Sequence, residues 1–147
     1  PSRRGGEAAT RPYRMQVAQL LAEAIDSVRR SNQHPLILVA GDFNDYTGDA
    51  SLQFLETRGL TNVSAKATGR HGARGTYRYH GVWASLDHVL CNATLLQRLR
   101  YCHINDKPFL LTDDEKYGGK KPKRNYLGPK YLNGYSDHLP LVTVFAF

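Results

Sequence analysis

The fold is decided by the stretch Leu36-Ile37-Leu38-Val39-Ala40-Gly41-Asp42-Phe43-Asn44. Its first five residues are consecutive and apolar, which predicts a strand that is buried on both faces. Gly41 breaks this run, and the polar residues Asp42 and Asn44 follow. Side chains that directly follow a buried strand project beyond the edge of a sheet, where α/β proteins build their sites. Residues 41–44 are therefore either an ordinary turn or part of a functional site.

A long helix is predicted ahead of this strand. Apolar residues recur at helical spacing from Val17 to Val28. Thr10 is the expected N-cap, Pro12 is tolerated in the first turn, and the pair Arg29-Arg30 suits the negative end of the helix dipole. The apolar stripe predicts a face that packs on the core.

The remaining predicted elements are short. A second helix is expected over residues 50–58, with Gly59 as its stop. The sequence further predicts strands over 76–79, 85–90, 100–104 and 139–147 and a short helix over 94–98. Residues 105–135 contain several glycines and prolines without periodicity, which predicts a long loop, and loops of that length are usually functional or disordered.

Composition bounds the class of protein. With 147 residues and 41% apolar content, the chain is long enough for one domain with its own core. The net charge of +7 favours phosphate-bearing or other anionic partners, although a basic surface that serves only solubility would have the same composition. Two cysteines, Cys91 and Cys102, are too few for a disulfide framework and lack the spacing of a zinc or redox motif.

The compartment stays open. The chain begins Pro1-Ser2-Arg3-Arg4, with neither an initiator Met nor a signal-like apolar stretch, so we expect a processed or truncated start. No apolar run is long enough for a transmembrane segment. Both a cytoplasmic and an exported parent protein fit these observations.

Acidic residues and histidines occur near the ends of two later strands. Asp137 and His138 come just before the last strand, either as a presented acid and imidazole or as turn and loop-capping residues. Asp87 lies near the start of an apolar strand, where a carboxylate is costly unless it is paired or hydrogen-bonded. A histidine is its natural partner.

Three segments together resemble a known family. They are Gly41-Asp42-Phe43-Asn44, Ser85-Leu86-Asp87-His88 and Ser136-Asp137-His138-Leu139-Pro140. In this order they are similar to the motifs of the endonuclease/exonuclease/phosphatase superfamily, whose members include DNase I-like nucleases, abasic-site endonucleases, inositol polyphosphate phosphatases and sphingomyelinases. Residues 1–6 also resemble the stretch that follows a site histidine in bacterial members.

The resemblance covers residues 1–147 but only about the second half of the family domain. It implies an α/β fold, a DNase I-like sandwich of two packed sheets flanked by helices, of which this chain is the C-terminal portion of a single domain. The early acidic metal ligand and the first site histidine of the family would lie before Pro1. A half sandwich would expose an apolar face, so we expect the chain to pair with itself or with the N-terminal half.

By resemblance, the parent protein is a metal-dependent phosphoesterase of the nuclease or phosphatase type, with Mg²⁺ or Mn²⁺ as cofactor. Asp42 would activate the attacking water or serve the leaving group, and Asn44 would hold that assembly and bind the phosphate. His138 would face the phosphate, with Asp87 fixing its tautomer and supporting its cationic form. Asp137 would be the acidic metal ligand, although a chain that lacks the early Glu should bind Mg²⁺ weakly.

The other polar and aromatic residues near these segments have less certain roles in the sequence, and Trp83 has two possible ones. Trp83 either lines the leaving-group side of the cleft and binds substrate, or packs in the core. His88 should point to the opposite face from Asp87 and be structural. The remaining acids are expected to be solvated charges or turn residues; they are Asp45, Asp49, Asp113 and Asp114.

The basic tract 116–124 and the tyrosines that follow it bear on the partner. Cations mixed with stacking rings are typical of single-stranded nucleic-acid sites, but the same loop could bind a phosphorylated sugar or lipid head group, or be only a solvated loop. Two rivals to the phosphoesterase thus remain open: a basic nucleic-acid-binding module without turnover, and an inert structural fragment.

Overall fold

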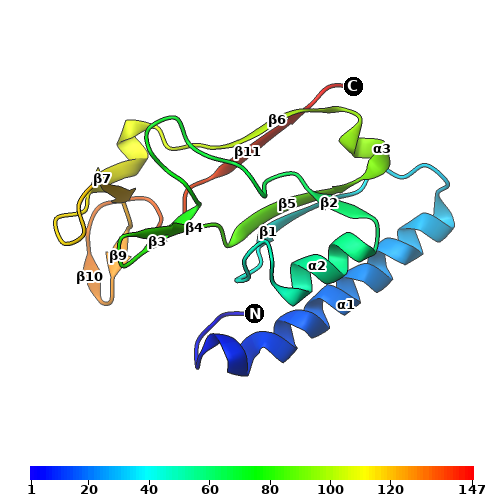
Figure 1. The fold of residues 1–147 in the computed structure, drawn as a ribbon, viewed down its shortest axis with the longest axis horizontal. Helices are drawn as coiled ribbons and strands as arrows, with labels where there is room; N and C mark the ends of the chain where they lie inside the picture. The colour runs from blue at the N-terminus through cyan, green and yellow to red at the C-terminus, as the bar shows by residue number, and fades with distance from the viewer.

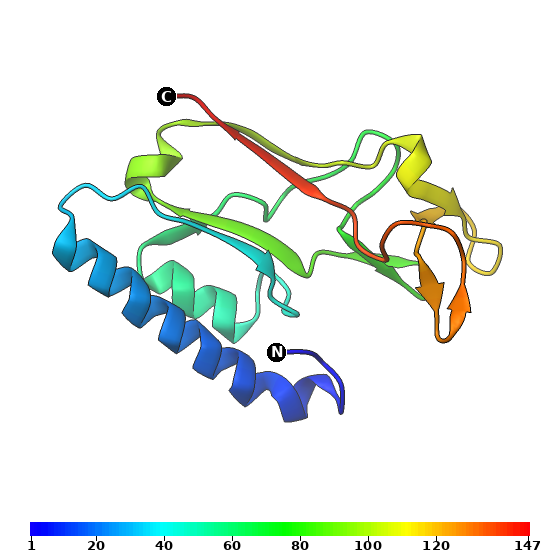
Figure 2. The same cartoon turned by 180° about the vertical axis from the view of Figure 1, so that it is seen from behind.

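The computed structural model describes residues 1–147 and has an α/β fold built in layers (Figure 1). The central layer is a three-stranded antiparallel sheet in the order β1-β5-β2. Two helices, α1 (Glu7–Ser31) and α2 (Ala50–Thr57), lie along one side of this sheet, and the antiparallel pair β6–β11 lies along the other side in both views (Figures 1 and 2). The expected α/β fold with helices flanking sheets is confirmed.

Helix α1 begins earlier than its cap signals predicted. It starts at Glu7 after Gly6, so Thr10 lies inside the helix and its hydroxyl donates to the carbonyl oxygen of Gly6 over 2.8 Å. The prediction that Thr10 is the N-cap is therefore wrong. Pro12 lies within the helix as well. Ser/Thr hydroxyls can satisfy a carbonyl within the first turns, which blurs the sequence signal for where a helix starts.

Strand β1 is the element whose environment differs most from its prediction. It runs over Leu38–Asp42 and pairs only with β5 (Asp87–Asn92), so it is an edge strand. Leu38 is 52% exposed and only Val39 within the strand is half-buried. The prediction of a strand buried on both faces is wrong for β1. It fits β5, the central strand, where every residue after Asp87 is buried.

The core consists of two clusters of buried side chains. The larger one joins α1 and α2 to the sheet; it comprises Ala18, Ala22, Ile25, Ile37, Leu52, Leu55, Leu60 and Leu90. The smaller one lies toward β6 (Leu99–Ile104) and β11 (Leu141–Phe145); it comprises Ala67, Ala73, Ile104 and Leu139.

Part of the predicted apolar face of α1 is not covered. Ala18, Ala22 and Ile25 are buried, whereas Val17, Leu20 and Val28 are 48% to 58% exposed. The stripe is thus only partly a core face. No helix of the structure has the length and apolarity that a membrane span requires.

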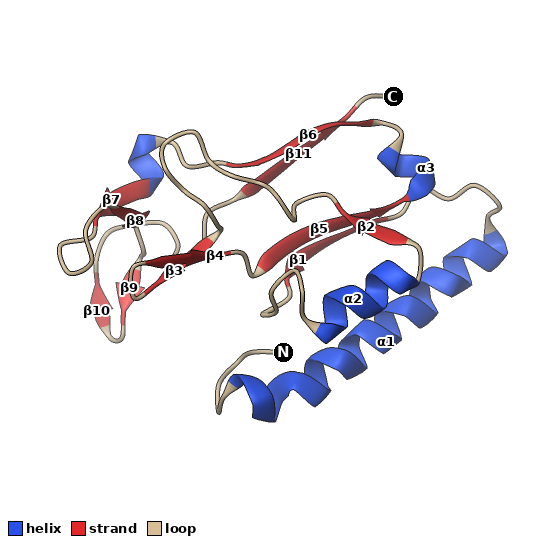
Figure 3. Cartoon of the chain, in the orientation of Figure 1, coloured by secondary structure: helices blue, strands red, loops and turns tan.

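Residues 105–135 contain more structure than the predicted loop. They hold a short 3₁₀ helix and two hairpins, which gather with a third hairpin at one end of the fold (Figure 3). The hairpins are β3 (Tyr77–Tyr79) with β4 (Val82–Ala84), β7 (Leu111–Asp113) with β8 (Lys120–Pro122), and β9 (Tyr126–Leu127) with β10 (Lys130–Tyr131). Two- and three-residue strands are too short to show a period in the sequence. The other elements are β2 (Leu60–Asn62) and α3 (Ala93–Leu96).

Candidate active site

Two carboxylates lie side by side at one end of the central sheet. In the antiparallel pair of β1 and β5, Asp42 is the direct partner of Asp87. The pairing continues one residue further, because the Phe43 N–H donates to the Leu86 carbonyl oxygen over 2.9 Å. Asp42 is exposed, whereas Asp87 is half-buried. The two acids are 45 positions apart in sequence and are brought together by this register alone.

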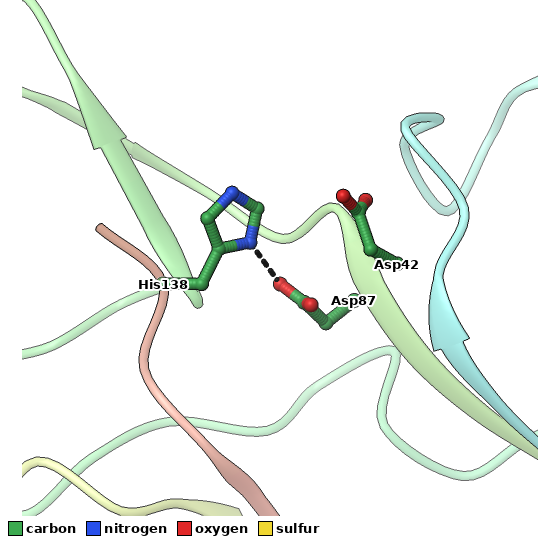
Figure 4. Close-up of side chains that lie close together, drawn as sticks. All are labelled: Asp42, Asp87 and His138. Atoms are coloured by element: carbon green, nitrogen blue, oxygen red, sulfur yellow. Dashed lines mark hydrogen bonds and ion pairs between the residues drawn. The ribbon is translucent and has the colours of Figure 1, made fainter. Parts of the chain in front are cut away.

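His138 reaches this carboxylate pair from a third segment of the chain. Its Nδ1 lies 2.7 Å from Oδ2 of Asp87 (Figure 4). The same Oδ2 accepts a hydrogen bond of 2.5 Å from the hydroxyl of Thr76, a fully buried side chain. His138 is held beside this strand end by an isolated antiparallel bridge to Tyr77 and by the Leu139 N–H, which donates to the Thr76 carbonyl oxygen over 2.7 Å.

The electrostatics of this pair favour an ionised acid and a charged imidazole. The hydrogen bond to Asp87 raises the pKa of His138 above its usual value, against the opposing effect of partial burial. Burial by itself would raise the pKa of Asp87, but the hydrogen bonds from His138 and Thr76 outweigh it and the pKa lies below the usual value. Each partner thus stabilises the charged form of the other.

Asn44 is tied to Asp42 in a tight turn. Its backbone N–H donates to Oδ1 of Asp42 over 2.8 Å, and its side-chain amide donates to Oδ2 over 3.1 Å. Asn44 has a φ of 53°, in the left-handed region that Asn tolerates better than most residues. Residues 41–44 thus form a turn, which was one of the two interpretations of the sequence. The same turn orients the Asp42 carboxylate.

A cavity of about 650 Å³ opens beside these residues and is lined by both polar and aromatic side chains. Asn44, Asp137 and His138 contribute to it, together with Tyr77 and Tyr79 from β3. Asp137 is exposed, and its charge, with that of Asp42, also raises the pKa of His138. The cavity can therefore present an imidazolium, a carboxylate and an amide to one bound group.

Arg3 is a residue of this cavity that sequence reasoning missed. Its Nε donates to the Asn44 carbonyl oxygen over 2.6 Å, and its guanidinium lies 4.2 Å from the centre of the Tyr46 ring. It also forms ion pairs with Glu7 at 3.4 Å and Asp49 at 3.6 Å. No motif marks such a contact across 41 positions, because it depends on how the first residues fold back beside β1.

Trp83 does not line this cavity. Alternation along β4 directs Val82 and Ala84 to the cavity, while Trp83 packs against the smaller core cluster. Of its two readings, this placement fits core packing, and the rings that line the cavity are Tyr46, Tyr77 and Tyr79.

His88 is buried on the helix side of the sheet, as its position after Asp87 predicted. Its Nδ1 lies 3.1 Å from the side-chain nitrogen of Asn62, and its Nε2 lies 2.9 Å from the Asp45 carbonyl oxygen. Burial lowers the pKa of His88, which keeps the ring neutral. His88 therefore supports the turn after β1 through its contact with the Asp45 carbonyl oxygen.

The prediction that Asp45 is a solvated or turn residue is wrong, and Asp114 is a turn residue, as predicted, but a buried one. Asp45 forms a buried ion pair of 2.6 Å with Arg14 of α1 and accepts a hydrogen bond of 2.6 Å from Ser51. Asp114 is 6% exposed and pairs with Arg78 at 3.2 Å. Short-range sequence signals missed both pairs because their partners are 31 and 36 positions away.

The other two acids behave as predicted. Asp49 is a turn residue whose Oδ2 accepts a hydrogen bond of 2.7 Å from the Tyr46 N–H at the start of α2. Asp113 has a side chain that is 77% exposed and pairs only with Lys120.

The site has donor groups that could hold a metal ion. Asp42, Asp87 and His138 each offer one ligand atom, and these atoms lie within 4.8 Å of one another. However, Nδ1 of His138 and Oδ2 of Asp87 are hydrogen-bonded to each other. The raised pKa of His138 also opposes its use as a metal ligand, because a ligating imidazole must be neutral. The carboxylates of Asp42 and Asp137 are exposed oxygen donors of the type that hard divalent cations prefer.

Solved structures with a similar fold include a phosphatase, an endonuclease/exonuclease/phosphatase family protein and a toxin, all from bacteria. The mannosyl-6-phosphatase of Bacteroides thetaiotaomicron VPI-5482 superposes with a TM-score of 0.61 at 19% identity, over 91% of this chain and 46% of that one. An endonuclease/exonuclease/phosphatase family protein from the same species gives 0.57 at 17% identity, over 87% and 43%. The beta toxin of Staphylococcus aureus gives 0.53 at 18% identity, over 96% and 47%.

The chain spans less than half the length of each of these structures, and at such identities the similarity is one of fold. No curated protein sequence matches the chain. The model of the Endonuclease/Exonuclease/phosphatase family, in contrast, matches residues 1–146. The ordered motifs, the fold and this match agree, and the chain belongs to the endonuclease/exonuclease/phosphatase family.

Proposed function

We propose that the chain provides the phosphate-facing part of the active site of a metal-dependent phosphoester hydrolase. The observation that carries this proposal is the meeting of Asp42, Asp87 and His138 at the end of the β1–β5 pair, with reactive atoms within 4.8 Å, beside a cavity of about 650 Å³. A cross-strand pair of like charges is destabilising by itself, so its presence beside a charged imidazole is typical of a functional site.

In this proposal His138 binds a non-bridging oxygen of the phosphate as an imidazolium. Its Nδ1 proton is held by Asp87, so the free Nε2–H is the donor that remains for the substrate. Asp87 is a positioning residue, since it acts through His138. The Thr76 hydroxyl fixes Asp87 in turn.

Asp42 is the proposed acceptor for a proton of the attacking water. The water oxygen then forms a bond to phosphorus as the bond from phosphorus to the leaving oxygen breaks. Asn44 fixes both oxygens of the Asp42 carboxylate through its N–H and its amide, which leaves that carboxylate oriented toward the site. The Asn44 side chain is also close enough to the cavity to bind the phosphate.

A divalent cation fits the exposed carboxylate of Asp137 by donor type, with Mg²⁺ or Mn²⁺ as the proposed ion. When bound, such an ion would supply positive charge to the phosphate oxygens. One carboxylate satisfies only part of the coordination that Mg²⁺ requires, so we expect weak binding by this chain.

We further propose that the chain is the C-terminal portion of one family domain. It spans 43% to 47% of the solved structures that share its fold, and apolar side chains of α1 and β1 are exposed. The absent half, or a second copy of this chain, would cover that face, and the absent half would add metal ligands. Hydrolysis by the complete domain is therefore the stronger test of the proposal.

The test compares the wild-type chain with Asp42→Ala in the presence of Mg²⁺, on a phosphomonoester such as mannose 6-phosphate and on a phosphodiester such as single-stranded DNA. Where a longer protein carries this chain, the same pair is assayed in that protein. We expect Asp42→Ala to lower the rate by about a hundredfold or more. The matched control is Asp113→Ala, which removes an exposed acid that does not line the cavity and should leave the rate unchanged.

Equal rates for the wild type and Asp42→Ala would contradict the proposed chemistry. Salt-sensitive binding of DNA without cleavage, by the complete domain, would instead favour a nucleic-acid-binding module.

A further inference from the structure

A second cavity adjoins the one at His138. It has a volume of about 500 Å³ and shares Tyr79 and His80 with the first cavity. Its lining residues come mainly from the short hairpins, which lie at one end of the fold (Figure 3). Positive charges outnumber negative ones in its lining, which contains five cations and one carboxylate; these are Arg78, Lys116, Lys121, Lys123, Arg124 and Asp114.

Arg78 shapes this cavity and is not free to bind a ligand. Its side chain is only 8% exposed, and it donates to the carbonyl oxygens of Gly81, Gly118 and Lys120 over 2.8 to 3.0 Å. Its ion pair with Asp114 uses the one acidic group of the lining. Arg78 thus joins the β3–β4 hairpin to the β7–β8 hairpin and neutralises Asp114.

The other cations leave the cavity with excess positive charge. Lys121 shares Asp114 with Arg78, at 3.3 Å, whereas Lys116, Lys123 and Arg124 form no ion pair with a carboxylate.

Lys123 and Arg124 follow β8 directly and are partly buried. The Lys123 N–H donates to the Leu110 carbonyl oxygen over 2.8 Å, and the Lys123 carbonyl oxygen accepts from the Tyr135 N–H over 2.6 Å. A Cβ on Gly134 would lie 2.6 Å from the carbonyl carbon of Arg124, so the two segments pack backbone against backbone. These two cations are therefore carried by ordered chain and not by a free loop.

Aromatic rings connect the two cavities. The ring of His138 lies 4.9 Å from that of Tyr77, which stacks on Tyr79 at 6.4 Å. Tyr79 stacks on His80 at 4.0 Å, and His80 lies 5.5 Å from Tyr117 at the basic cavity. Tyr79 is 61% exposed, so this track of rings borders solvent between the two sites.

We propose that the basic cavity binds a second phosphate group of a substrate whose scissile phosphoester lies at His138. This inference rests on the proposed function and narrows its substrate to molecules that carry a further phosphate. A single phosphate at His138 leaves Lys116, Lys123 and Arg124 without an anionic partner. Flat rings between two anion sites suit the uncharged part of such a substrate, such as a nucleobase.

The phosphate could belong to a phosphodiester chain or to a small bisphosphorylated molecule. Binding to the chain is measured without metal by fluorescence anisotropy, using a labelled oligothymidylate of about ten nucleotides. The test variant is Lys123→Ala/Arg124→Ala, and the matched control is Lys66→Ala/Arg11→Ala, which removes two exposed cations outside both cavities. Circular dichroism checks that both double variants keep the fold.

We expect the test variant to bind more weakly than the control, and the slope of log Kd against log salt to fall by about 0.7 for each cation removed. Unlabelled competitors then identify the source of the phosphate. Displacement by a nucleoside bisphosphate, but not by the monophosphate, points to a small molecule, while displacement only by oligonucleotide points to a phosphodiester chain. Either result requires the second subsite.

Equal affinity and salt slope in the test variant and the control would overturn the proposal. The proposal would also be overturned if the chain bound vesicles of phosphatidylserine and phosphatidylcholine through Lys123 and Arg124 but did not bind the oligonucleotide. Binding here needs neither metal nor turnover, so its failure is distinct from a failure to hydrolyse phosphoesters, which bears on Asp42 and His138.

Discussion

The imidazole of His138 and the carboxylate of Asp87 are hydrogen-bonded at 2.7 Å although 51 positions separate them in the chain. Asp87 begins the central strand, and His138 precedes the last one. The bond turns a half-buried carboxylate, which would be costly alone, into the group that keeps the imidazole charged and oriented.

Replacing Asp87 by Asn should lower the pKa of His138. The amide keeps the shape of the side chain but removes the negative charge, and the hydrogen bond to the Asp87 carboxylate is the largest cause of the raised pKa. NMR titration of the histidine Cε1–H signals measures this shift. If an imidazolium binds the phosphate, the alkaline limit of hydrolysis should move to lower pH, and the rate near neutral pH should fall by about a hundredfold.

Asp113→Asn is the control for that titration, because Asp113 is exposed and makes no contact with a histidine. An unchanged His138 titration in Asp87→Asn would show that the carboxylate does not hold the proton.

The stability that Asp87 and His138 give each other should depend on pH with two opposite limits. The pKa of Asp87 is lowered by folding, so its contribution is present above its unfolded value of 3.8 and is lost as the pH falls through the folded value. The pKa of His138 is raised, so its contribution is present below 6.5 and is lost as the pH rises through the folded value. The difference in unfolding free energy between the wild type and Asp87→Asn should therefore be largest between about pH 4 and 6.5, as measured by urea denaturation across pH. A difference that does not vary with pH would contradict ionic pairing.

The pairing of Asp87 with a histidine could be predicted from the sequence for a physical reason. A carboxylate at the start of an apolar strand requires a partner, and His138 stands in a segment that also precedes a strand. The sequence also predicted β5 as a strand, because Val89-Leu90-Cys91 is a short apolar run with a β-branched residue.

Other parts could not be predicted, because they depend on tertiary arrangement. The apolar run of β1 is the same whether the strand is central or at an edge, so its exposure followed only from the sheet order. Arg3 reaches Asn44, and Arg14 reaches Asp45, only once α1 packs beside the sheet.

Replacing Asp45 by Ala should destabilise the fold more than the same replacement of an exposed acid. The Arg14–Asp45 pair has side-chain exposures of 1% and 3%, so the substitution leaves a buried guanidinium without its charge partner. We expect a loss of about 3 to 5 kcal/mol in the free energy of unfolding. The control, Asp113→Ala, breaks a pair whose members are 77% and 51% exposed, and should cost less than about 1 kcal/mol. Urea denaturation of both variants at pH 7 makes the comparison, and similar losses would contradict a structural role for the buried pair.

Gly75→Ala should weaken both the fold and the site. A Cβ on Gly75 would lie 2.5 Å from the carbonyl carbon and 2.7 Å from the nitrogen of Ala84, both backbone atoms of β4 that cannot rotate away. We expect a loss of about 1 to 3 kcal/mol on thermal or urea unfolding. Gly48→Ala is the control, because a Cβ there meets nothing within 4 Å, and it should change stability by less than about 1 kcal/mol.

The displacement at Gly75 should also reach the active-site pair. Thr76 is the next residue, and its hydroxyl holds Oδ2 of Asp87, the same oxygen that binds His138. A shift of this segment would lengthen that bond, raise the pKa of Asp87 and thereby lower that of His138. The His138 NMR titration in Gly75→Ala, measured where the variant is still folded, should move in the same direction as in Asp87→Asn but by less. A destabilised variant with an unmoved titration would mean that the contact with β4 supports the fold without supporting the orientation of Asp87.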